Sequence, residues 1–422
     1  MRFSKLMFAF DGNPVSNKNE AKFHSISTNL VIFSYLNNRC TKSHLMNTQT
    51  TVKKIPFISL RTEPGFDEAV EARWQKALHN SQFIAGPATK ELESKILDYT
   101  QANNFIPCAN GTDAIQLALR AVGIGQGDSV LLPDFTFWAT YEAIINVGAT
   151  PIMVDVSSQD YQMDFDLFLE AVQKFKPKAA ILVHLYGWCS SRLNEFRAYC
   201  SKEKIFLIED GAQSIGSLFE GERIFQSAFL ATTSFYPAKV LGAAGDAGGI
   251  FCQDKAIAEK CVQLGNHGRS SHYGHEYVGW NSRMDELQAH FLCESLEKLP
   301  ERIKSRRESE KKYFDFISKN PNLPLEAKLE PSNIQGNGYL QVSIAKSSYK
   351  DLSAKLNLLG ITTGNVYPSP MSAQKGAINP ILVSKDHVTQ QISKKVINLP
   401  LFPYMTDSEI DYVCDCLVNS SS

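Results

Sequence analysis

Apolar residues recur with two periods downstream of residue 55, and the two periods predict alternating strands and helices. Helical spacing predicts helices over residues 66–77 and 89–99, and a further helix that begins near Thr112. Strands that are separated by helices favour a mostly parallel sheet with helices on both faces. The strands are expected at residues 129–132, 151–155, 179–185, 205–209, 231–235 and 249–252.

A long amphipathic stretch divides this part of the chain. Apolar residues recur at helical spacing from Met284 to Leu299, and the stretch continues into the charged residues 301–312. Beyond it, residues 339–344 are typical of a strand and residues 350–359 of a helix. The pattern therefore predicts a large α/β domain over residues 55–300 and a smaller C-terminal α+β domain over residues 301–422.

Composition narrows the class of protein. The chain has 43 basic and 44 acidic residues and a net charge of −1, which argues against a surface for nucleic acid or an anionic membrane. No apolar run approaches the roughly twenty residues that a membrane helix needs. The nine cysteines are scattered, and no Cys/His cluster has the spacing of a metal site. Reduced thiols and a cytoplasmic location are the expected result.

Lys239 is the first candidate for chemistry. It follows a predicted strand and precedes the glycine-rich residues 242–249, and Asp210 ends an earlier strand. An enzyme that uses pyridoxal phosphate (PLP) needs a lysine amine that forms a Schiff base with the cofactor's aldehyde. It also needs a buried carboxylate that keeps the ring nitrogen protonated. A lone lysine near glycine is far more often a surface charge, so this interpretation depends on the other parts of the site.

A phosphate site is the next part. Gly111 permits a tight turn and Thr112 is a good N-cap, so the free N–H groups of the helix that begins there can bind an anion. Asp113 lies in the first turn, and Ser234 can add a hydroxyl from a position just before Lys239. An ordinary capped helix after a loop has the same pattern.

Two further side chains suit the ring of such a cofactor. Phe137 lies at a strand-to-helix corner, where an aromatic side chain can stack on a pyridine ring, although core packing is its commoner use. Gln213 follows Asp210 closely and can donate to the phenolic oxygen of the ring, with a surface amide as the alternative.

These parts occur in an order that resembles the DegT/DnrJ/EryC1/StrS family of sugar aminotransferases. That family has fold type I of the PLP-dependent transferases, the aspartate aminotransferase fold. The resemblance extends from about Ile55 to near the C-terminus. Gly211 departs from it, because the family usually has alanine there, and the smaller residue is expected to fit. The matching motifs lie at residues 83–87, 109–114, 148–155, 184–187, 209–214, 234–239, 266–269, 279–289 and 399–403.

The resemblance implies a role for each part of the site. Lys239 carries PLP and moves the proton, Asp210 pairs with the ring nitrogen, and Gln213 meets the phenolic oxygen. Phe137 stacks on the ring. Asn281 matches an asparagine that reaches the phosphate from the neighbouring subunit, so the resemblance implies a homodimer with shared active sites. The phosphate is expected on Gly111, Thr112, Asp113 and Ser234.

The most similar members act on a UDP-linked 3-keto-N-acetylglucosaminuronate. Arg283 matches an arginine that contacts the substrate in those enzymes, and a guanidinium suits a carboxylate or a diphosphate. Tyr367 is expected at the substrate as well. Phe83 replaces a tyrosine, Ser81 a glycine and Val366 a histidine of those enzymes, so a 3-keto or 4-keto-6-deoxy sugar on dTDP stays open.

The resulting prediction is an aminotransferase that moves an amino group from L-glutamate to a keto-sugar nucleotide in cell-surface polysaccharide synthesis. A secondary-metabolite sugar is the alternative. A PLP-binding regulator or sensor of the same fold, and a PLP enzyme for another substrate class, stay open. Lys239 argues against the related branch that dehydrates sugars, which has histidine there, and a regulator need not keep the lysine.

The first 54 residues lie outside the resemblance. They are rich in Asn, Ser, Thr and Lys and contain one brief apolar patch at residues 30–33. We expect this extension to lack packed structure. Because the family-like sequence begins near Ile55, we hypothesise that translation begins at Met46. A weak signal or an amphipathic segment is the alternative.

Overall fold

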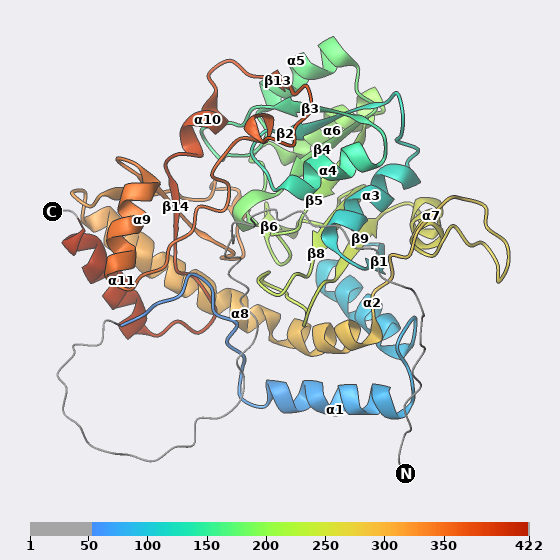
Figure 1. The fold of residues 1–422 in the computed structure, drawn as a ribbon, viewed down its shortest axis with the longest axis horizontal. Coiled ribbons are helices and arrows are strands. Elements are labelled where there is room, and N and C mark those ends of the chain that lie inside the picture. The colour runs from blue at the N-terminus through green and yellow to red at the C-terminus, as the bar shows by residue number, and fades with distance from the viewer. Residues whose placement is uncertain (1–52, 421–422) are drawn as a thin grey trace, which may run out of the picture. The chain divides into compact units, whose positions relative to one another are not determined.

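The computed structural model describes residues 53–420, and an eight-stranded sheet is its central element (Figure 1). The strand order is β1-β9-β8-β5-β4-β2-β3-β13, and β9 alone runs antiparallel to its neighbours in this sheet. The predicted mostly parallel α/β sheet is confirmed. The strands are β1 (Asn104–Cys108), β2 (Ser129–Pro133), β3 (Thr150–Val154), β4 (Ala179–Val183), β5 (Phe206–Asp210), β8 (Leu230–Ser234), β9 (Gly248–Cys252) and β13 (Ile381–Val383).

Helices cover this sheet on both faces. In Figure 1, α3 and α4 lie in front of the strands, with α5 and α6 behind them. The amphipathic helices α3 and α5 bury one face in the core, and the helix expected near Thr112 is α3. The helices before residue 286 are α1 (Phe66–His79), α2 (Pro87–Thr100), α3 (Gly111–Ala121), α4 (Trp138–Asn146), α5 (Phe165–Phe175), α6 (Leu193–Glu203) and α7 (Lys255–Gly265), with a 3-10 turn at Leu185–Gly187.

The predicted long helix is α8 (Glu286–Lys319), which continues through Pro300. It joins the main core to a second hydrophobic core, in which Ile55 packs beside Tyr313 and Ile361. The second core is built on β10 (Leu325–Ala327), β12 (Gln341–Ala345), β14 (Val396–Leu399), α9 (Tyr349–Leu358) and α11 (Asp407–Asn419). The remaining elements are β6 (Leu218–Phe219), β7 (Glu222–Arg223), β11 (Ile334–Gln335), a 3-10 turn at Met371–Ala373 and α10 (Val388–Ile392).

The predicted boundaries of one strand, of the domains and of the translated chain have different outcomes. The strand expected at residues 339–344 begins only at Gln341, because the N–H of Tyr339 bonds to the side chain of Asn337 and not to a neighbouring strand. The division between domains at residues 300 and 301 stays a prediction. So does the start at Met46, which lies outside the described residues.

No helix between residues 53 and 420 combines the length and apolarity needed to cross a bilayer.

The parallel strands bring several polar residues to one edge of the sheet. Asp210 and Ser234 are the last residues of β5 and β8, and His184 follows the last residue of β4. Ligands of open α/β sheets bind beyond the carboxyl ends of the strands. The fold therefore places the sequence motifs where a ligand site is expected.

Candidate active site

A cavity of about 760 Å³ opens at the carboxyl ends of β4, β5 and β8. A cavity of this size holds a cofactor together with part of a small substrate. Most of the residues that the sequence singled out line it. They are Gly111, Thr112, Asp113, Phe137, Asp210, Gln213, Ser234, Lys239 and Tyr367.

One end of the cavity is suited to an anion. Helix α3 begins there, and its N-cap is Asn110, whose Oδ1 accepts from the N–H of Asp113 at 2.8 Å. The expected N-cap, Thr112, is instead a first-turn residue. Within the described residues the N–H groups of Gly111 and Thr112 have no hydrogen-bond partner, and both lie at the positive end of the helix dipole.

A close approach between two segments shapes this end. A Cβ on Gly111 would lie 2.7 Å from Cβ of Ser234, so only glycine lets the helix start pack against the end of β8. The Ser234 hydroxyl accepts a hydrogen bond from the N–H of Tyr236 at 3.3 Å. It keeps its own hydrogen for another acceptor, such as a phosphate oxygen.

At the other end a buried carboxylate faces the cavity. Asp210 is 5% exposed, and its two oxygens accept from the Thr140 hydroxyl at 3.0 Å and from the N–H of Ala212 at 3.2 Å. Burial raises the pKa of Asp210 above its usual value, although these hydrogen bonds oppose the shift. A cationic group beside this carboxylate would stabilise its charged form.

The neighbouring residue, Glu209, points away from this site. Arg197 binds both of its oxygens, at 2.8 and 2.9 Å, and Nε2 of His184 lies 2.9 Å from one of them. Burial opposes ionisation, but Arg197 and His184 together hold the pKa of Glu209 below its usual value. Of these two adjacent buried carboxyl groups, Glu209 forms ion pairs, whereas Asp210 forms none with the described residues and has Lys239 only as a more distant charge in the same cavity.

The Gln213 amide has a fixed orientation. Its Oε1 accepts from the N–H of Tyr186 at 2.6 Å, and its Nε2 donates to the hydroxyl of Tyr367. Tyr186 has φ of 66° and is followed by Gly187 with φ of 82°, a strained turn that directs this N–H toward Gln213. The second hydrogen of Nε2 is left for an acceptor in the cavity.

Lys239 extends into the same cavity from a tight turn after β8. The turn needs Gly242, because a Cβ there would overlap the carbonyl of Pro237. The amine of Lys239 lies 5.1 Å from the ring centroid of Tyr339. Phe137 is 62% exposed at the cavity rim, where a ring can be covered by a ligand.

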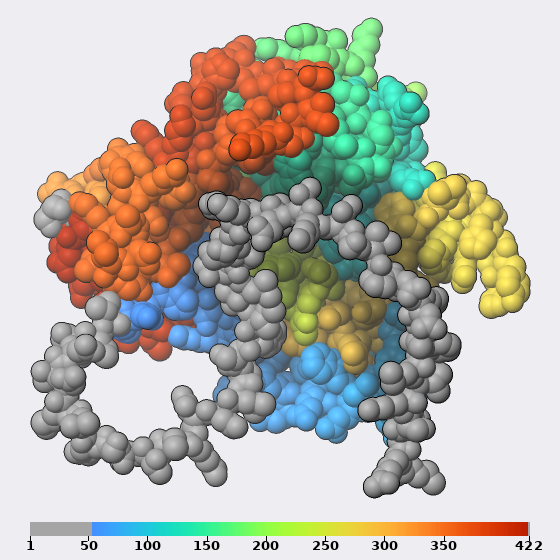
Figure 2. All heavy atoms as spheres, in the orientation of Figure 1, coloured from blue at the N-terminus to red at the C-terminus, as the bar shows by residue number. Residues whose placement is uncertain are grey.

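Four sequence-predicted residues lie outside this cavity. Arg283 donates to Asn281 at 3.1 Å and to Asn266 at 3.0 Å, so two family-like motifs form one polar cluster. This cluster is at the base of the segment after α7, drawn in yellow, which protrudes in Figures 1 and 2. Ser81 and Phe83 follow α1, where Ser81 has φ of 53° and Phe83 is 45% exposed.

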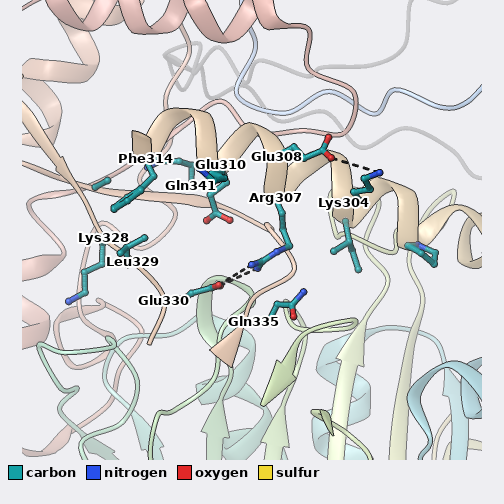
Figure 3. Close-up of a pocket in the computed structure, with 14 residues that line it drawn as sticks. Lys304, Arg307, Glu308, Glu310, Phe314, Lys328, Leu329, Glu330, Gln335 and Gln341 are labelled. Carbon is teal, nitrogen blue, oxygen red and sulfur yellow. Dashed lines mark hydrogen bonds and ion pairs between the residues drawn. The ribbon is translucent and has the colours of Figure 1, made fainter. Parts of the chain in front are cut away.

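A second cavity, of about 530 Å³, lies beneath the C-terminal half of α8. Figure 3 shows the Glu310 carboxylate pointing into it, while Arg307 reaches Glu330, 3.2 Å away. This cavity lies away from the strand ends, and neither Lys239 nor the start of α3 lines it. Among residues 53–420, no group of His, Cys, Asp and Glu is placed to hold a metal ion.

Some residues of the site were missed by sequence reasoning. Thr140 binds Asp210 and lies one helical turn after Thr136, with the two hydroxyls 3.0 Å apart, so spacing could have indicated it. Asn337 and Tyr339 come from the C-terminal part of the chain. No local pattern marks them, because their roles depend on how the two cores meet.

The residues of the first cavity fit PLP. Helix N–H groups and a hydroxyl suit its phosphate, the buried Asp210 suits a protonated ring nitrogen, and the free amine of Lys239 suits its aldehyde. The amide of Gln213 is oriented by the N–H of Tyr186, which donates to its Oε1. Within this set, the ionised form of Asp210 is the group that the positive charge of the ring nitrogen would stabilise most.

Comparisons with known proteins agree with this fit. The DegT/DnrJ/EryC1/StrS aminotransferase family model matches residues 65–418. The chain is 36% identical to a UDP-2-acetamido-2-deoxy-3-oxo-D-glucuronate aminotransferase of Pseudomonas aeruginosa, over 86% of this chain and 100% of that one. It is 34% identical to a UDP-N-acetyl-3-dehydro-alpha-D-glucosamine 3-aminotransferase of Acidithiobacillus ferrooxidans, over 86% of this chain and 96% of that one.

A solved structure supports the fold and the cofactor. The NtdA protein of Bacillus subtilis, crystallised with the cofactor PMP, superposes with a TM-score of 0.78 at 27% identity, over 89% of this chain and 87% of that one. The predicted fold type, PLP as cofactor and the class of sugar-nucleotide aminotransferase are confirmed by these matches. The chain belongs to the DegT/DnrJ/EryC1/StrS aminotransferase family.

Proposed function

We propose that the protein transfers the amino group of L-glutamate to the ring ketone of a nucleotide-linked sugar. The observation that carries the proposal is the meeting of Lys239 and Asp210 in one cavity, beside an anion-binding helix start. When bound, PLP supplies an aldehyde that accepts the amino group and a ring that withdraws electrons. We further propose that the enzyme acts in the cytoplasm, in the synthesis of cell-surface polysaccharide.

Each side chain then has one task. The Lys239 amine holds the cofactor until the donor displaces it, and then moves a proton between substrate and cofactor. Asp210 keeps the proton on the ring nitrogen, and Gln213 donates to the phenolic oxygen. Ser234 and the N–H groups at the start of α3 hold the phosphate, and the exposed face of Phe137 covers the ring.

A second copy of the chain is part of this proposal. Asn281 and Arg283 are held together but outside the cavity of their own protomer. Their protruding segment carries Tyr273 and Val278, which are 88% and 82% exposed. Apolar side chains exposed to this degree on one segment favour contact with another protein surface. We infer a homodimer in which Asn281 and Arg283 complete the partner's site, with Ser81 and Phe83 near the substrate.

Charge bears on the identity of the sugar. Lys239 is the sole lysine or arginine among the described residues that line the cavity, where Asp113 and Asp246 add negative charge. A sugar carboxylate would therefore depend on Arg283 of the second copy. We propose two acceptor classes on this basis, a UDP-linked 3-keto-N-acetylhexuronate and a neutral dTDP-linked 3- or 4-keto-6-deoxyhexose.

The first test is a visible spectrum of the purified protein before and after addition of L-glutamate without any sugar. We expect the absorbance of lysine-bound cofactor to disappear as one equivalent of 2-oxoglutarate per site is released, and Lys239→Ala to lack that absorbance. A spectrum that glutamate leaves unchanged would contradict the glutamate donor and favour a regulatory role.

The second test identifies the acceptor. The aminated protein is mixed with each keto-sugar nucleotide, and the return of the lysine-bound absorbance marks a substrate. If the acceptor is a uronate, Arg283→Ala should raise its KM at least about tenfold and change that of a neutral sugar far less. Equal loss for both classes would contradict a role of Arg283 at the sugar carboxylate.

A further inference from the structure

Tyr339 presents its ring to the amine of Lys239. Nζ of Lys239 lies 5.1 Å from the ring centroid, and both side chains line the cavity. Among the described residues, no other side chain makes a hydrogen bond or an ion pair with this amine. An ammonium at this distance from an aromatic face is attracted by the negative charge of the ring's π-system.

The position of Tyr339 is fixed by its neighbours in the chain. The N–H of Tyr339 donates to Oδ1 of Asn337 at 3.0 Å. Asn337 is fully buried, and its Nδ2 donates to the carbonyls of Gln213 and Ile215 at 2.8 and 2.9 Å. The segment that carries the ring is therefore tied to the loop that follows Asp210.

The other side of the segment is equally restricted. Gly338 has φ of 68°, and a Cβ there would lie 2.8 Å from Cβ of Arg306. Arg306 is 5% exposed and donates to the carbonyls of Gly338 and Leu401, at 3.4 and 3.1 Å. These contacts fix the backbone that carries Tyr339 on both sides, so its ring is held near Lys239.

A ring differs from a carboxylate as a partner for this amine. A carboxylate would add its own charge to a cavity that already contains Asp210, and it would accept the proton that Lys239 has to move. An aromatic face attracts the ammonium without accepting a proton. The contact is expected to be strongest while the amine is free, because covalent attachment replaces the compact ammonium by a nitrogen bonded to the cofactor.

We propose that Tyr339 is a positioning residue that stabilises Lys239 while its amine is free, and thereby favours the form of the enzyme that carries the amino group. The inference rests on the proposed role of Lys239 as the lysine that holds the cofactor. The half-reaction consumes glutamate and one water molecule. It yields 2-oxoglutarate, whose carbonyl oxygen comes from that water, the aminated cofactor, and Lys239 as a free ammonium. The ring of Tyr339 stabilises the free ammonium of Lys239 in this product.

The equilibrium constant of this half-reaction measures the effect. The protein with PLP is titrated with mixtures of glutamate and 2-oxoglutarate, and the absorbance of lysine-bound cofactor gives the ratio of the two forms. We expect Tyr339→Leu to lower the constant by about 2- to 30-fold, the range that a ring–ammonium contact provides. Tyr339→Phe keeps the ring and should stay within about twofold of the wild type.

Three controls distinguish loss of the ring–ammonium contact from a general loss of protein stability. Tyr339→Met is a second variant without a ring, for use if the Leu variant is unstable. Phe175→Leu removes a ring that lies 5.0 Å from the amine of Lys174, outside the cavity, and should leave the constant unchanged. In the protein without cofactor, acetic anhydride should label Lys239 faster in the Leu variant than in the Phe variant.

The outcomes are distinct. A lowered constant in the Leu or Met variant, with the Phe variant unchanged, supports the inference. An unchanged constant in the Leu and Met variants, or an equal fall in the Phe variant, would overturn it. If the wild type itself fails to convert with glutamate, the proposed function is wrong and this inference is wrong with it.

Discussion

At the residue scale, the main feature is the contrast between two adjacent buried carboxyl groups. Glu209 has Arg197 and His184 as partners, whereas Asp210 has only neutral donors. Burial accordingly raises the pKa of Asp210, and the ion pair lowers that of Glu209. A protein keeps such an uncompensated group when a ligand supplies the missing charge.

We therefore predict that Asp210→Asn weakens the half-reaction and not the fold. The variant removes the partner of the ring's protonated nitrogen, and breaking a buried pair of this kind costs about 3–5 kcal/mol. The first-order rate of glutamate conversion should fall by about 10²- to 10⁴-fold in stopped-flow absorbance measurements. Unfolding of the protein without cofactor serves as the control, and a rate within tenfold of the wild type would contradict the prediction.

The structure explains why this chain has Gly211 where the family usually has alanine. A Cβ at this position would overlap the ring of Phe225, which stacks on Phe251 with centroids 4.3 Å apart. The glycine therefore makes room for this aromatic pair, immediately beside Asp210. The smaller residue is required here, and not merely tolerated.

This packing leads to a prediction for a double-mutant cycle. Gly211→Ala should lower the free energy of unfolding by about 1–3 kcal/mol, as overpacking does. In a Phe225→Leu background the same change should cost less than about 1 kcal/mol, because the smaller side chain leaves space for the methyl group. Urea denaturation of the four proteins measures both costs. Equal costs in the two backgrounds would show that Phe225 is not the obstacle.

At the element scale, one residue of the motif at residues 279–289 stabilises the fold, a role that the resemblance to sugar aminotransferases does not indicate. Glu286, the first residue of α8, accepts from the N–H groups of Gly86, Ala88 and Thr89 at 2.8, 2.9 and 3.0 Å. It therefore caps α2, which has no capping side chain of its own. Burial opposes the charge of Glu286, but these donors and the Thr89 hydroxyl hold its pKa below the usual value.

We predict that Glu286→Ala lowers the free energy of unfolding by about 2–4 kcal/mol at pH 7, because it leaves several buried donors without an acceptor. The depressed pKa of Glu286 means that the charge stabilises the fold above the unfolded-state pKa and less as pH falls through the folded-state pKa. The gap between wild type and Glu286→Gln should therefore narrow in acid.

The matched control for this capping role is Glu297→Ala on the same helix. Glu297 is half-exposed and pairs with Lys95 at the surface at 2.7 Å, so its loss should cost less than about 1 kcal/mol. Chemical denaturation at pH 7 and near pH 4 compares the three variants. Similar losses for Glu286→Ala and Glu297→Ala would argue against the cap.

The elements that the sequence predicted well are those with a local signal. Six strands and the long helix α8 follow from apolar periodicity, because each buries a regular set of side chains. Two strands of the main sheet, β1 and β13, were missed. β1 contains Pro107, which only an edge strand accommodates, and β13 has three residues and joins β3 from far along the chain. Such pairings depend on tertiary contacts that a local window does not contain.

At the scale of the whole molecule, the site is completed by residues that come from the second half of the chain. Lys239, Asp210 and Gln213 could be predicted because each lies at or soon after the end of a strand of the main sheet, in a recognisable motif. Asn337 and Tyr339 could not, since their roles arise from docking of the segment after α8 against the loop beyond Asp210. The site therefore depends on the relative position of the two cores, and α8 is the element that spans both.

The second cavity lies beneath this connecting helix and contains a carboxyl group whose pKa is raised. The Glu310 side chain points into it (Figure 3), and burial together with the nearby Glu330 raises the pKa of Glu310 to about 7. The other charged residues around it are largely paired, as Arg307 with Glu330 and Lys304 with Glu308, 4.0 Å apart. Glu310 itself has no partner among the described residues.

The sign of the effect follows from proton binding. A folded-state pKa of about 7 against an ordinary value of 4.5 means that the folded protein binds the Glu310 proton more tightly than the unfolded chain does. Stability is then lost as pH rises between these two values. The full shift would correspond to about 3 kcal/mol, and partial exposure of the side chain reduces this to about 1–2 kcal/mol.

We predict that Glu310→Gln, which mimics the protonated carboxyl group, raises the free energy of unfolding by about 1–2 kcal/mol at pH 8 and leaves it nearly unchanged at pH 4.5. Glu308→Gln, at a surface-paired position two residues away, should change stability by less than about 1 kcal/mol at both values of pH. Urea denaturation of the three proteins across pH 4.5–8 measures the difference. If Glu310→Gln destabilises the protein at pH 8, the folded protein stabilises the charged form of Glu310, and the prediction of a raised pKa is wrong.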